Sequence, residues 1–167
     1  MRIAVVVGNP KPASRTLNVA TALADLLAAE LAPDAGHLVV DLAEHASDLF
    51  DWGAPRLTEL TQEVASAGLI IAASPTYKAT YTGMLKAFFD RYGNNGLAGS
   101  VAVPLMTGAA PIHQLAVEVH LRPLLVELGA AVPTRGLYVT EPEFGELAGP
   151  VGRWNEAAVP LLRRSLG

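Results

Sequence analysis

The chain has 167 residues, of which 51% are hydrophobic and 17% charged, and its formal net charge is −4. This balance excludes an intrinsically disordered chain, and no cluster of lysine and arginine offers the basic face that nucleic-acid binding requires. Without cysteine, disulfides, cysteine metal sites and thiolate catalysis are excluded. No apolar run approaches the roughly 18 residues of a membrane span, and the run near the N-terminus is too short for a signal peptide. The chain length suits one core, and the missing cysteines suit the cytoplasm, so we expect a single cytoplasmic domain over residues 1–167 that does not enter a membrane.

Short apolar runs alternate with amphipathic stretches along the chain. Strands are expected at residues 3–7, 38–42, 69–73, 101–106 and 132–139. Most of these runs lack strict polar alternation, which is typical of strands buried on both faces of a parallel sheet. Helical spacing of apolar residues appears in 17–31, 57–67, 84–89, 112–128 and roughly 152–166, where Pro160 is expected to interrupt or shorten the helix. The pattern predicts a doubly wound α/β fold with three layers and ligand-binding loops at one sheet edge.

The loop after the first strand, residues 8–17, carries cationic and hydroxyl side chains and leads into a helix. The cations are Lys11 and Arg15, and the hydroxyls are Ser14 and Thr16. Free amides and the dipole at a helix N-terminus attract an anion, so this loop predicts a phosphate site. The alternative is a connecting turn in which Ser14 only caps the helix.

The loops after the third and fourth strands offer different chemistry. Pro75 restricts the backbone, and Tyr77 provides a flat amphipathic surface that can line an aromatic ring. The alternative is that Tyr77 and Tyr81 only pack at a helix entry. After the fourth strand, Gly108 and its small neighbours let backbone amides approach a ligand closely. Together the three loops predict a pocket for a phosphorylated, flat, polar heterocycle.

Several other functions lack their sequence motifs. The chain has no G-x-G-x-x-G dinucleotide fingerprint, no P-loop and no G-x-S-x-G nucleophile elbow. Ser74-Pro75 stands where a receiver domain needs an aspartate. No two of the histidines (37, 45, 113 and 120) have the i, i+3 or i, i+4 spacing of helical metal ligands, so no metal site is predicted. No nucleophile with triad partners is visible, and we assign no catalytic acid, base or nucleophile.

These loops resemble those of the NADPH-dependent FMN reductase family of flavodoxin-like proteins. Residues 8–16 are similar to the family's G-S-x-R-x-x-S-x-T signature, and residues 74–90 resemble its S-P-x-Y…G-x-L-K…D block. Residues 107–109 and 121–130 resemble its T-G-G…L-R-P…L-G-A segment. The resemblance implies a five-stranded parallel sheet in the order 2-1-3-4-5, FMN bound across the three loops, and NADPH or NADH as hydride donor.

The resemblance also implies the site residues. The first signature includes Asn9, and the FMN phosphate would contact Lys11, Ser14, Arg15 and Thr16. The isoalloxazine ring would be lined by Pro75, Thr76, Tyr77 and Lys78. Its pyrimidine side would meet backbone donors of Thr107, Gly108 and Ala109. Ala109 replaces a common second glycine, and a positive φ there would strain the backbone.

The same resemblance suggests how the reduced flavin is used. The chain is similar to reductases that hand reduced FMN to a partner monooxygenase. One alternative is an enzyme that keeps its FMN and reduces quinones, azo dyes or metal ions. The other is a non-enzymatic flavodoxin-like electron carrier, which usually presents a more acidic docking face than a net charge of −4 provides.

Residues 112–128 carry two apolar stripes, one more than a helix on a sheet surface needs. One stripe contains residues 112, 115, 116, 119 and 126, and the other contains residues 117, 121, 124 and 128. The second stripe predicts a partner helix and thus a homodimer, disrupted by Leu121→Glu or Leu124→Glu, and the family resemblance also allows a tetramer. The alternative is one wide face buried within the monomer. Pro123 cannot donate to the Val119 carbonyl, so a kink or bulge is expected near 119–123.

Overall fold

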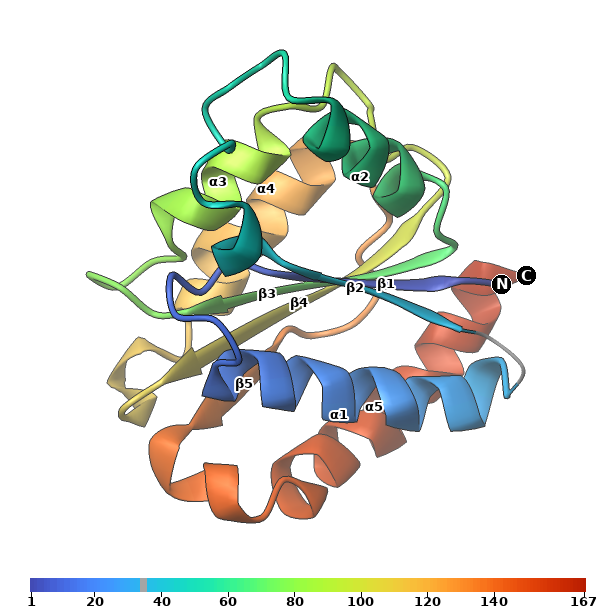
Figure 1. Cartoon of the computed structure of the whole chain (residues 1–167). Coiled ribbons are helices and arrows are strands. Elements are labelled where there is room, and N and C mark those ends of the chain that lie inside the picture. The colour runs from blue at the N-terminus through green and yellow to red at the C-terminus, as the bar shows by residue number, and fades with distance from the viewer. Residues whose placement is uncertain (34–35) are drawn as a thin grey trace.

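The computed structural model describes residues 1–33 and 36–167, and a five-stranded parallel sheet lies at its centre (Figure 1). The strands are β1 (Ile3–Val7), β2 (His37–Asp41), β3 (Leu69–Pro75), β4 (Val101–Gly108) and β5 (Leu137–Thr140), in the spatial order β2-β1-β3-β4-β5. One face is covered by α1 (Arg15–Leu31) and α5 (Ala148–Leu166), and the other by α2 (Pro55–Ala65), α3 (Gly83–Phe89) and α4 (Arg122–Glu127). The predicted flavodoxin-like fold and strand order are confirmed.

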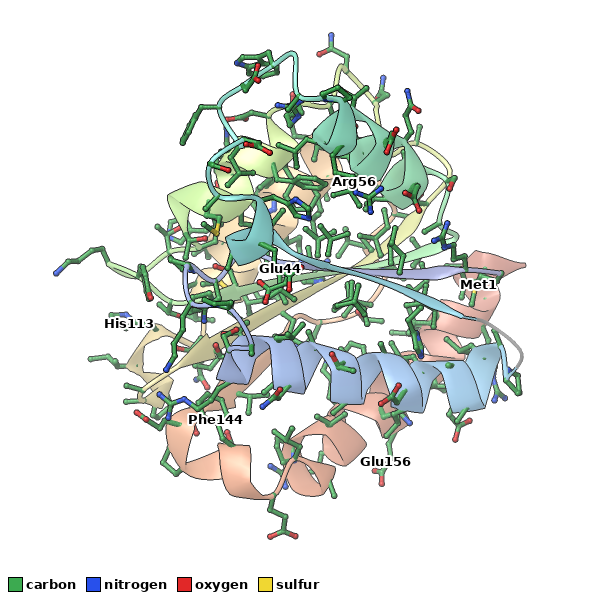
Figure 2. All side chains as sticks on the ribbon, viewed as in Figure 1. Met1, Glu44, Arg56, His113, Phe144 and Glu156 are labelled. Carbon is green, nitrogen blue, oxygen red and sulfur yellow. The ribbon has the colours of Figure 1, made fainter. Side chains whose placement is uncertain are left out.

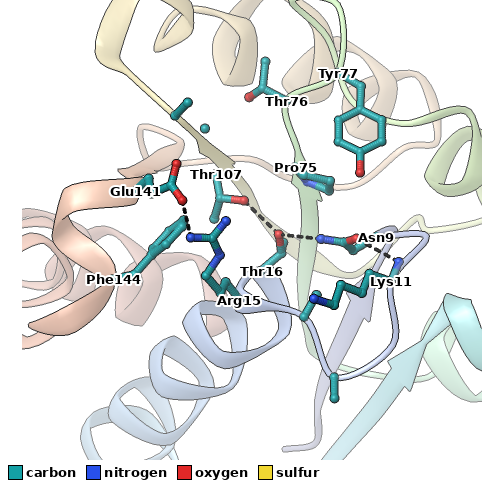
Figure 3. A pocket seen from close by; sticks show the side chains of 14 residues that line it. Asn9, Lys11, Arg15, Thr16, Pro75, Thr76, Tyr77, Thr107, Glu141 and Phe144 are labelled. Carbon is teal, nitrogen blue, oxygen red and sulfur yellow. Dashed lines mark hydrogen bonds and ion pairs between the residues drawn. The ribbon is translucent and has the colours of Figure 1, made fainter.

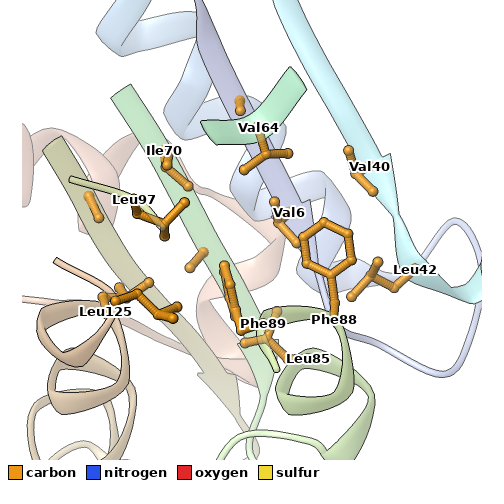
Figure 4. Close-up of a cluster of buried hydrophobic side chains, with 14 of the residues drawn as sticks. Val6, Val40, Leu42, Val64, Ile70, Leu85, Phe88, Phe89, Leu97 and Leu125 are labelled. Atoms are coloured by element: carbon orange, nitrogen blue, oxygen red, sulfur yellow. The ribbon is translucent and has the colours of Figure 1, made fainter. Parts of the chain in front are cut away.

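Apolar side chains form a core on each face of the sheet. Every residue of β1 and β3 is buried, as their uninterrupted apolar runs predict. On the α2–α4 face, Phe88 and Phe89 of α3 pack edge to face with ring centroids 5.7 Å apart, in one cluster with Val6 and Ile70 (Figure 4). Burying each such side chain contributes about 1.5–3 kcal/mol. The central strands are therefore fixed from both sides, and so are the loops at their carboxyl ends.

Strand β5 begins later than expected, because the predicted run over 132–139 includes a stretch that is not a strand. Ala131 forms only an isolated bridge with Val101, and β5 proper begins at Leu137. Pro133 has no N–H to donate to a neighbouring strand. The guanidinium of Arg122 instead donates to the Val132 and Thr134 carbonyls, the first at 2.7 Å. These contacts with a side chain replace the sheet hydrogen bonds that a strand there would make.

The predicted helix 112–128 is divided into three parts, and the distortion lies where Pro123 predicts it. A 3-10 turn over Pro111–His113 is followed by a π-helix over Val117–Leu121 and then by α4. The Arg122 amide donates to the Val117 carbonyl, five residues back, as in a π-bulge. The missing N–H of Pro123 thus accompanies a change in backbone pairing, and the expected bulge is confirmed.

The expectation that Pro160 interrupts the last helix is wrong, because α5 runs from Ala148 to Leu166 through it. Pro160 leaves the Glu156 carbonyl without its helical donor. Both residues are exposed, so water can hydrate that carbonyl at little cost. Val159 and Leu162 are buried in the core beneath the sheet and anchor the helix on either side of the proline.

His113 and Phe144 lie at the end where the strands reach their carboxyl termini, and Met1 lies at the opposite end (Figure 2). Across residues 1–33 and 36–167, no helix is both long enough and apolar enough to cross a bilayer.

Candidate functional site

A pocket of about 430 Å³ lies at the carboxyl edge of the sheet, next to the β1/β3 point where the strand order reverses (Figure 3). Open α/β sheets bind ligands at this place, and the volume falls within the usual range for ligand pockets. Eleven of the twelve residues predicted for the site line it: Asn9, Lys11, Ser14, Arg15, Thr16, Pro75, Thr76, Tyr77, Thr107, Gly108 and Ala109. Lys78 is exposed and is not among the lining residues.

The first loop reaches the pocket through the N-terminus of α1. Ser14 is the N-cap, and its Oγ accepts a hydrogen bond of 3.2 Å from the Leu17 amide. The interpretation of Ser14 as a cap is therefore correct, although Ser14 also lines the pocket. The remaining free amides of the first turn carry the positive end of the helix dipole, and Lys11 and Arg15 add full charges. This side of the pocket favours an anion.

Asp41 fixes the shape of the same loop, although sequence reasoning did not single it out. Its Oδ2 accepts from the Ala13 amide at 3.1 Å, and its Oδ1 accepts from the Ala43 amide at 3.2 Å. Ala13 has a φ of 50°, an unfavourable conformation for a residue with a Cβ atom. The buried Asp41 carboxylate compensates by pairing the Ala13 amide.

A chain of hydrogen bonds connects the first loop to β4 beneath the pocket. The Asn9 Nδ2 donates to Thr16 Oγ1 at 3.2 Å, and Thr16 Oγ1 lies 2.8 Å from Thr107 Oγ1 (Figure 3). All three side chains are buried. The Thr16 hydroxyl, predicted as a phosphate donor, is thus already engaged in joining two of the three loops.

The second loop places its two tyrosines differently. Tyr77 is 52% exposed and lines the pocket, whereas Tyr81 packs against the α2–α4 core. The alternative, that the tyrosines only pack at a helix entry, is therefore correct for Tyr81 and wrong for Tyr77. The loop is held by a tight turn in which Tyr77 N donates to Thr80 O at 2.8 Å and Thr80 N donates back to Tyr77 O at 3.2 Å. Lys78 lies at the tip of this turn with a φ of 51° and is exposed.

Gly108, the last residue of β4, packs closely against the Tyr138 side chain. A Cβ atom added there would lie 2.8 Å from Tyr138 Cζ and 3.4 Å from Thr76 Oγ1. Thr76 Oγ1 donates to the Tyr138 hydroxyl at 3.3 Å, so the space beside Gly108 is occupied by this pair. Ala109 is not among the residues with positive φ, and its methyl group brings no such strain.

Three lining residues were missed: Ala13 of the first loop, and Glu141 and Phe144 of the 3-10 turn Glu141–Gly145 that follows β5. The Glu141 carboxylate forms an ion pair with Arg15, and the Arg15 guanidinium lies over the Phe144 ring at 5.0 Å (Figure 3). The position of this segment could have indicated Glu141 and Phe144, because the segment directly follows the last strand and so lies at the same edge of the sheet as the other loops. Nothing in the sequence pairs residue 141 with residue 15.

Ion pairs and hydrogen bonds to carboxylates set the electrostatics at this edge of the sheet. Within the described part of the chain, no group of three or more metal-ligating side chains occurs. The Thr140 backbone amide donates to Glu143 and, together with the Thr140 hydroxyl and nearby Arg153, lowers the pKa of that carboxyl, against a smaller opposing effect of burial. Glu143 is therefore ionised at neutral pH and anchors the turn that carries Glu141.

Comparisons with known proteins agree with one another. The family model described as NADPH-dependent FMN reductase matches residues 1–143. The chain is 32% identical over 151 residues to the NADH-dependent FMN reductase SfnF of Pseudomonas putida, covering 87% of this chain and 81% of that protein. It is 32% identical over 147 residues to the FMN reductase (NADPH) of Pseudomonas aeruginosa, covering 85% and 77%. The apo crystal structure of the NADH:FMN oxidoreductase EMOB superposes with a TM-score of 0.88 and 30% identity, covering 99% of this chain and 90% of that one.

Proposed function

The chain belongs to the NADPH-dependent FMN reductase family, and we propose that FMN binds in the pocket at the carboxyl edge of its sheet. Family membership makes the protein an oxidoreductase that uses FMN together with NADPH or NADH. One observation carries the placement of FMN. The pocket joins a cationic helix N-terminus, an exposed aromatic side chain and a glycine-containing loop, which suit the phosphate, the ring and the ring edge of a flavin nucleotide.

Each loop has a proposed role in binding. Lys11, Arg15 and the first amides of α1 contact the phosphate, while Ser14 keeps those amides in place as the N-cap. The isoalloxazine ring lies against Pro75 and Tyr77, and backbone amides of 107–109 meet its pyrimidine side. Bound FMN supplies the redox chemistry by accepting a hydride from NADPH or NADH. The protein's own part is to bind and orient the ring and to offer amides to developing negative charge.

The reduced flavin is proposed to leave the pocket and to serve a partner monooxygenase. The rim supports exchange, because Tyr77, Arg15 and Glu141 are all exposed. A colourless purified protein that oxidises NADPH or NADH only when FMN is added, with saturation, would agree with release. Yellow protein with stoichiometric FMN would instead favour the reductase that retains its flavin and reduces quinones, azo dyes or metal ions.

Tyr77 is expected to act through its ring surface and not through its hydroxyl. Tyr77→Phe should keep most of the hydride-transfer rate, and Tyr77→Ala should raise the FMN dissociation constant about threefold or more, because the exposed ring contributes stacking area. Stopped-flow reduction and fluorescence titration measure the two quantities. A loss of several orders of magnitude in rate for Tyr77→Phe would show that the hydroxyl takes part in the chemistry.

A homodimer, or a tetramer, is proposed to form through the outer stripe of residues 112–128. The exposed fractions are 82% for Ile112, 67% for Leu115, 57% for Val119 and 54% for Val126, whereas Ala116, also placed in this stripe, is buried. Large exposed apolar patches mark interaction sites. The other stripe is the one buried in the monomer: Leu121 is fully buried and Leu124 packs on the core. Leu121→Glu and Leu124→Glu, expected from the sequence to test the interface, would instead damage the monomer.

Val119→Glu is therefore the variant that tests this interface. Light scattering at micromolar concentration should show a multiple of the 17.5 kDa chain for the wild type and a shift towards the monomer for Val119→Glu. Val39→Glu is a matched control, because Val39 is an exposed valine on the edge strand β2. A monomeric wild type would refute the assembly, and dissociation by Val39→Glu alone would place the interface on β2.

A further inference from the structure

The Arg15 side chain is shared between the pocket and the turn that follows β5. Arg15 is the first residue of α1, so its backbone amide belongs to the helix end proposed to bind phosphate. Its guanidinium forms an ion pair with Glu141 and stacks on Phe144. Among the lining residues that the structure describes, Glu141 is the one with an acidic side chain. Its carboxylate pairs with Arg15, which is one of the cations of the proposed phosphate site.

The turn that carries Glu141 is fixed independently of Arg15. The Thr140 amide donates to Glu143 Oε2 at 2.8 Å, and the Thr140 hydroxyl donates to the same oxygen at 2.7 Å. Arg153 lies 3.5 Å from the other oxygen of Glu143. This capping box joins Thr140 to Glu143 and thereby fixes Glu141, the residue after Thr140, at the pocket rim. The carboxylate is thus presented to Arg15 by the fold and does not depend on a flexible segment.

We propose that Glu141 is an internal competitor of the FMN phosphate that weakens FMN binding and speeds its release. This inference rests on the proposed placement of FMN, with its phosphate at the N-terminus of α1. A phosphate and a carboxylate seek the same planar guanidinium donors. FMN can use Arg15 fully only when the Glu141 pair opens, and the Glu141 charge also repels the phosphate. The enzyme thereby treats FMN as an exchanging substrate.

The geometry limits the size of the effect. The Arg15 and Glu141 side chains are 63% and 50% exposed, and ion pairs between exposed side chains are weak and screened by salt. Removing the Glu141 charge should therefore lower the FMN dissociation constant by roughly two- to fivefold. Riboflavin has no phosphate and does not compete for Arg15, so its dissociation constant should stay within about twofold.

The test compares Glu141→Gln with Glu146→Gln. Both variants remove one negative charge, but Glu146 is exposed and lies outside the pocket lining. Quenching of flavin fluorescence gives dissociation constants for FMN and riboflavin, and stopped-flow dilution gives the FMN dissociation rate. Glu141→Gln should bind FMN more tightly and release it more slowly by a similar factor, whereas Glu146→Gln should match the wild type. In an Arg15→Gln background, Glu141→Gln should change FMN binding by a smaller factor than it does with Arg15 present, because only the direct repulsion of the phosphate is left.

Several outcomes would overturn the inference. An unchanged FMN dissociation constant in Glu141→Gln would show that the carboxylate does not compete. Weaker FMN binding would show that Glu141 instead holds Arg15 in a productive position. An equal gain for riboflavin, or for FMN in Glu146→Gln, would indicate a change unrelated to the phosphate. If wild-type protein bound FMN no better than riboflavin, the proposed placement of FMN itself would fail, which is a separate result.

Discussion

Replacing Gly8 with alanine is expected to lower the free energy of unfolding by about 3 kcal/mol, the upper end of the usual range for overpacking. An added Cβ would lie 2.9 Å from the Leu85 Cα and 3.0 Å from the Leu85 amide nitrogen, so it would meet backbone that cannot rotate away. Gly8 is also held in place: its amide donates to the Ala73 carbonyl at 2.8 Å, and its carbonyl accepts from the Thr82 hydroxyl. The start of α3 must therefore shift.

Gly83→Ala provides the matched control, because Gly83 is the first residue of α3 and a Cβ there meets nothing within 4 Å. Its stability should change by no more than about 0.5 kcal/mol, since the substitution adds no clash and reduces the freedom of the unfolded chain. Urea unfolding with a shared slope measures both variants. Equal midpoints for Gly8→Ala and the wild type would show that α3 moves without cost. A shift of α3 should also weaken FMN binding, because the loop ahead of α3 carries Tyr77.

The parts of the fold that the sequence predicted well are those governed by local pattern. β1 and β3 are continuous apolar runs, and burial on both faces follows directly from that pattern. The site loops were found because parallel strands bring their carboxyl ends to one edge. The bulge at Val117–Leu121 followed from the chemistry of one residue, Pro123, which lacks an amide proton.

The parts that failed depend on contacts between distant residues. The stretch ahead of β5 has the apolar pattern of a strand, but the Arg122 guanidinium donates hydrogen bonds to the carbonyls of Val132 and Thr134. The ion pair of Arg15 with Glu141 spans 126 positions, so no local motif signals it. Which stripe of residues 112–128 faces outward also depends on where the chain meets the sheet, and periodicity alone gives two equivalent answers.

FMN is expected to bind at least tenfold more tightly than riboflavin, a difference of about 1.4 kcal/mol. Hydrogen bonds to charged groups contribute roughly 1.5–3 kcal/mol each. The pocket offers Lys11, Arg15 and the α1 amides to a phosphate, so a tenfold preference is the low end of what these donors allow. The competing Glu141 carboxylate reduces what Arg15 contributes to phosphate binding.

Lys11→Met isolates the phosphate contact better than Ser14→Ala does. Ser14 is the N-cap of α1, and its loss would also cost about 1 kcal/mol of stability. Lys11 is exposed and lines the pocket, so its replacement should raise the FMN dissociation constant about fivefold or more and leave riboflavin unchanged. Lys86→Met removes the same charge from α3, where Lys86 pairs with Asp90, and should leave the FMN-to-riboflavin ratio intact. Fluorescence titration measures the dissociation constants of both flavins. Two outcomes would show that the phosphate does not bind at this end of the pocket. One is equal dissociation constants for FMN and riboflavin in the wild type, and the other is the same change in FMN binding for both lysine variants.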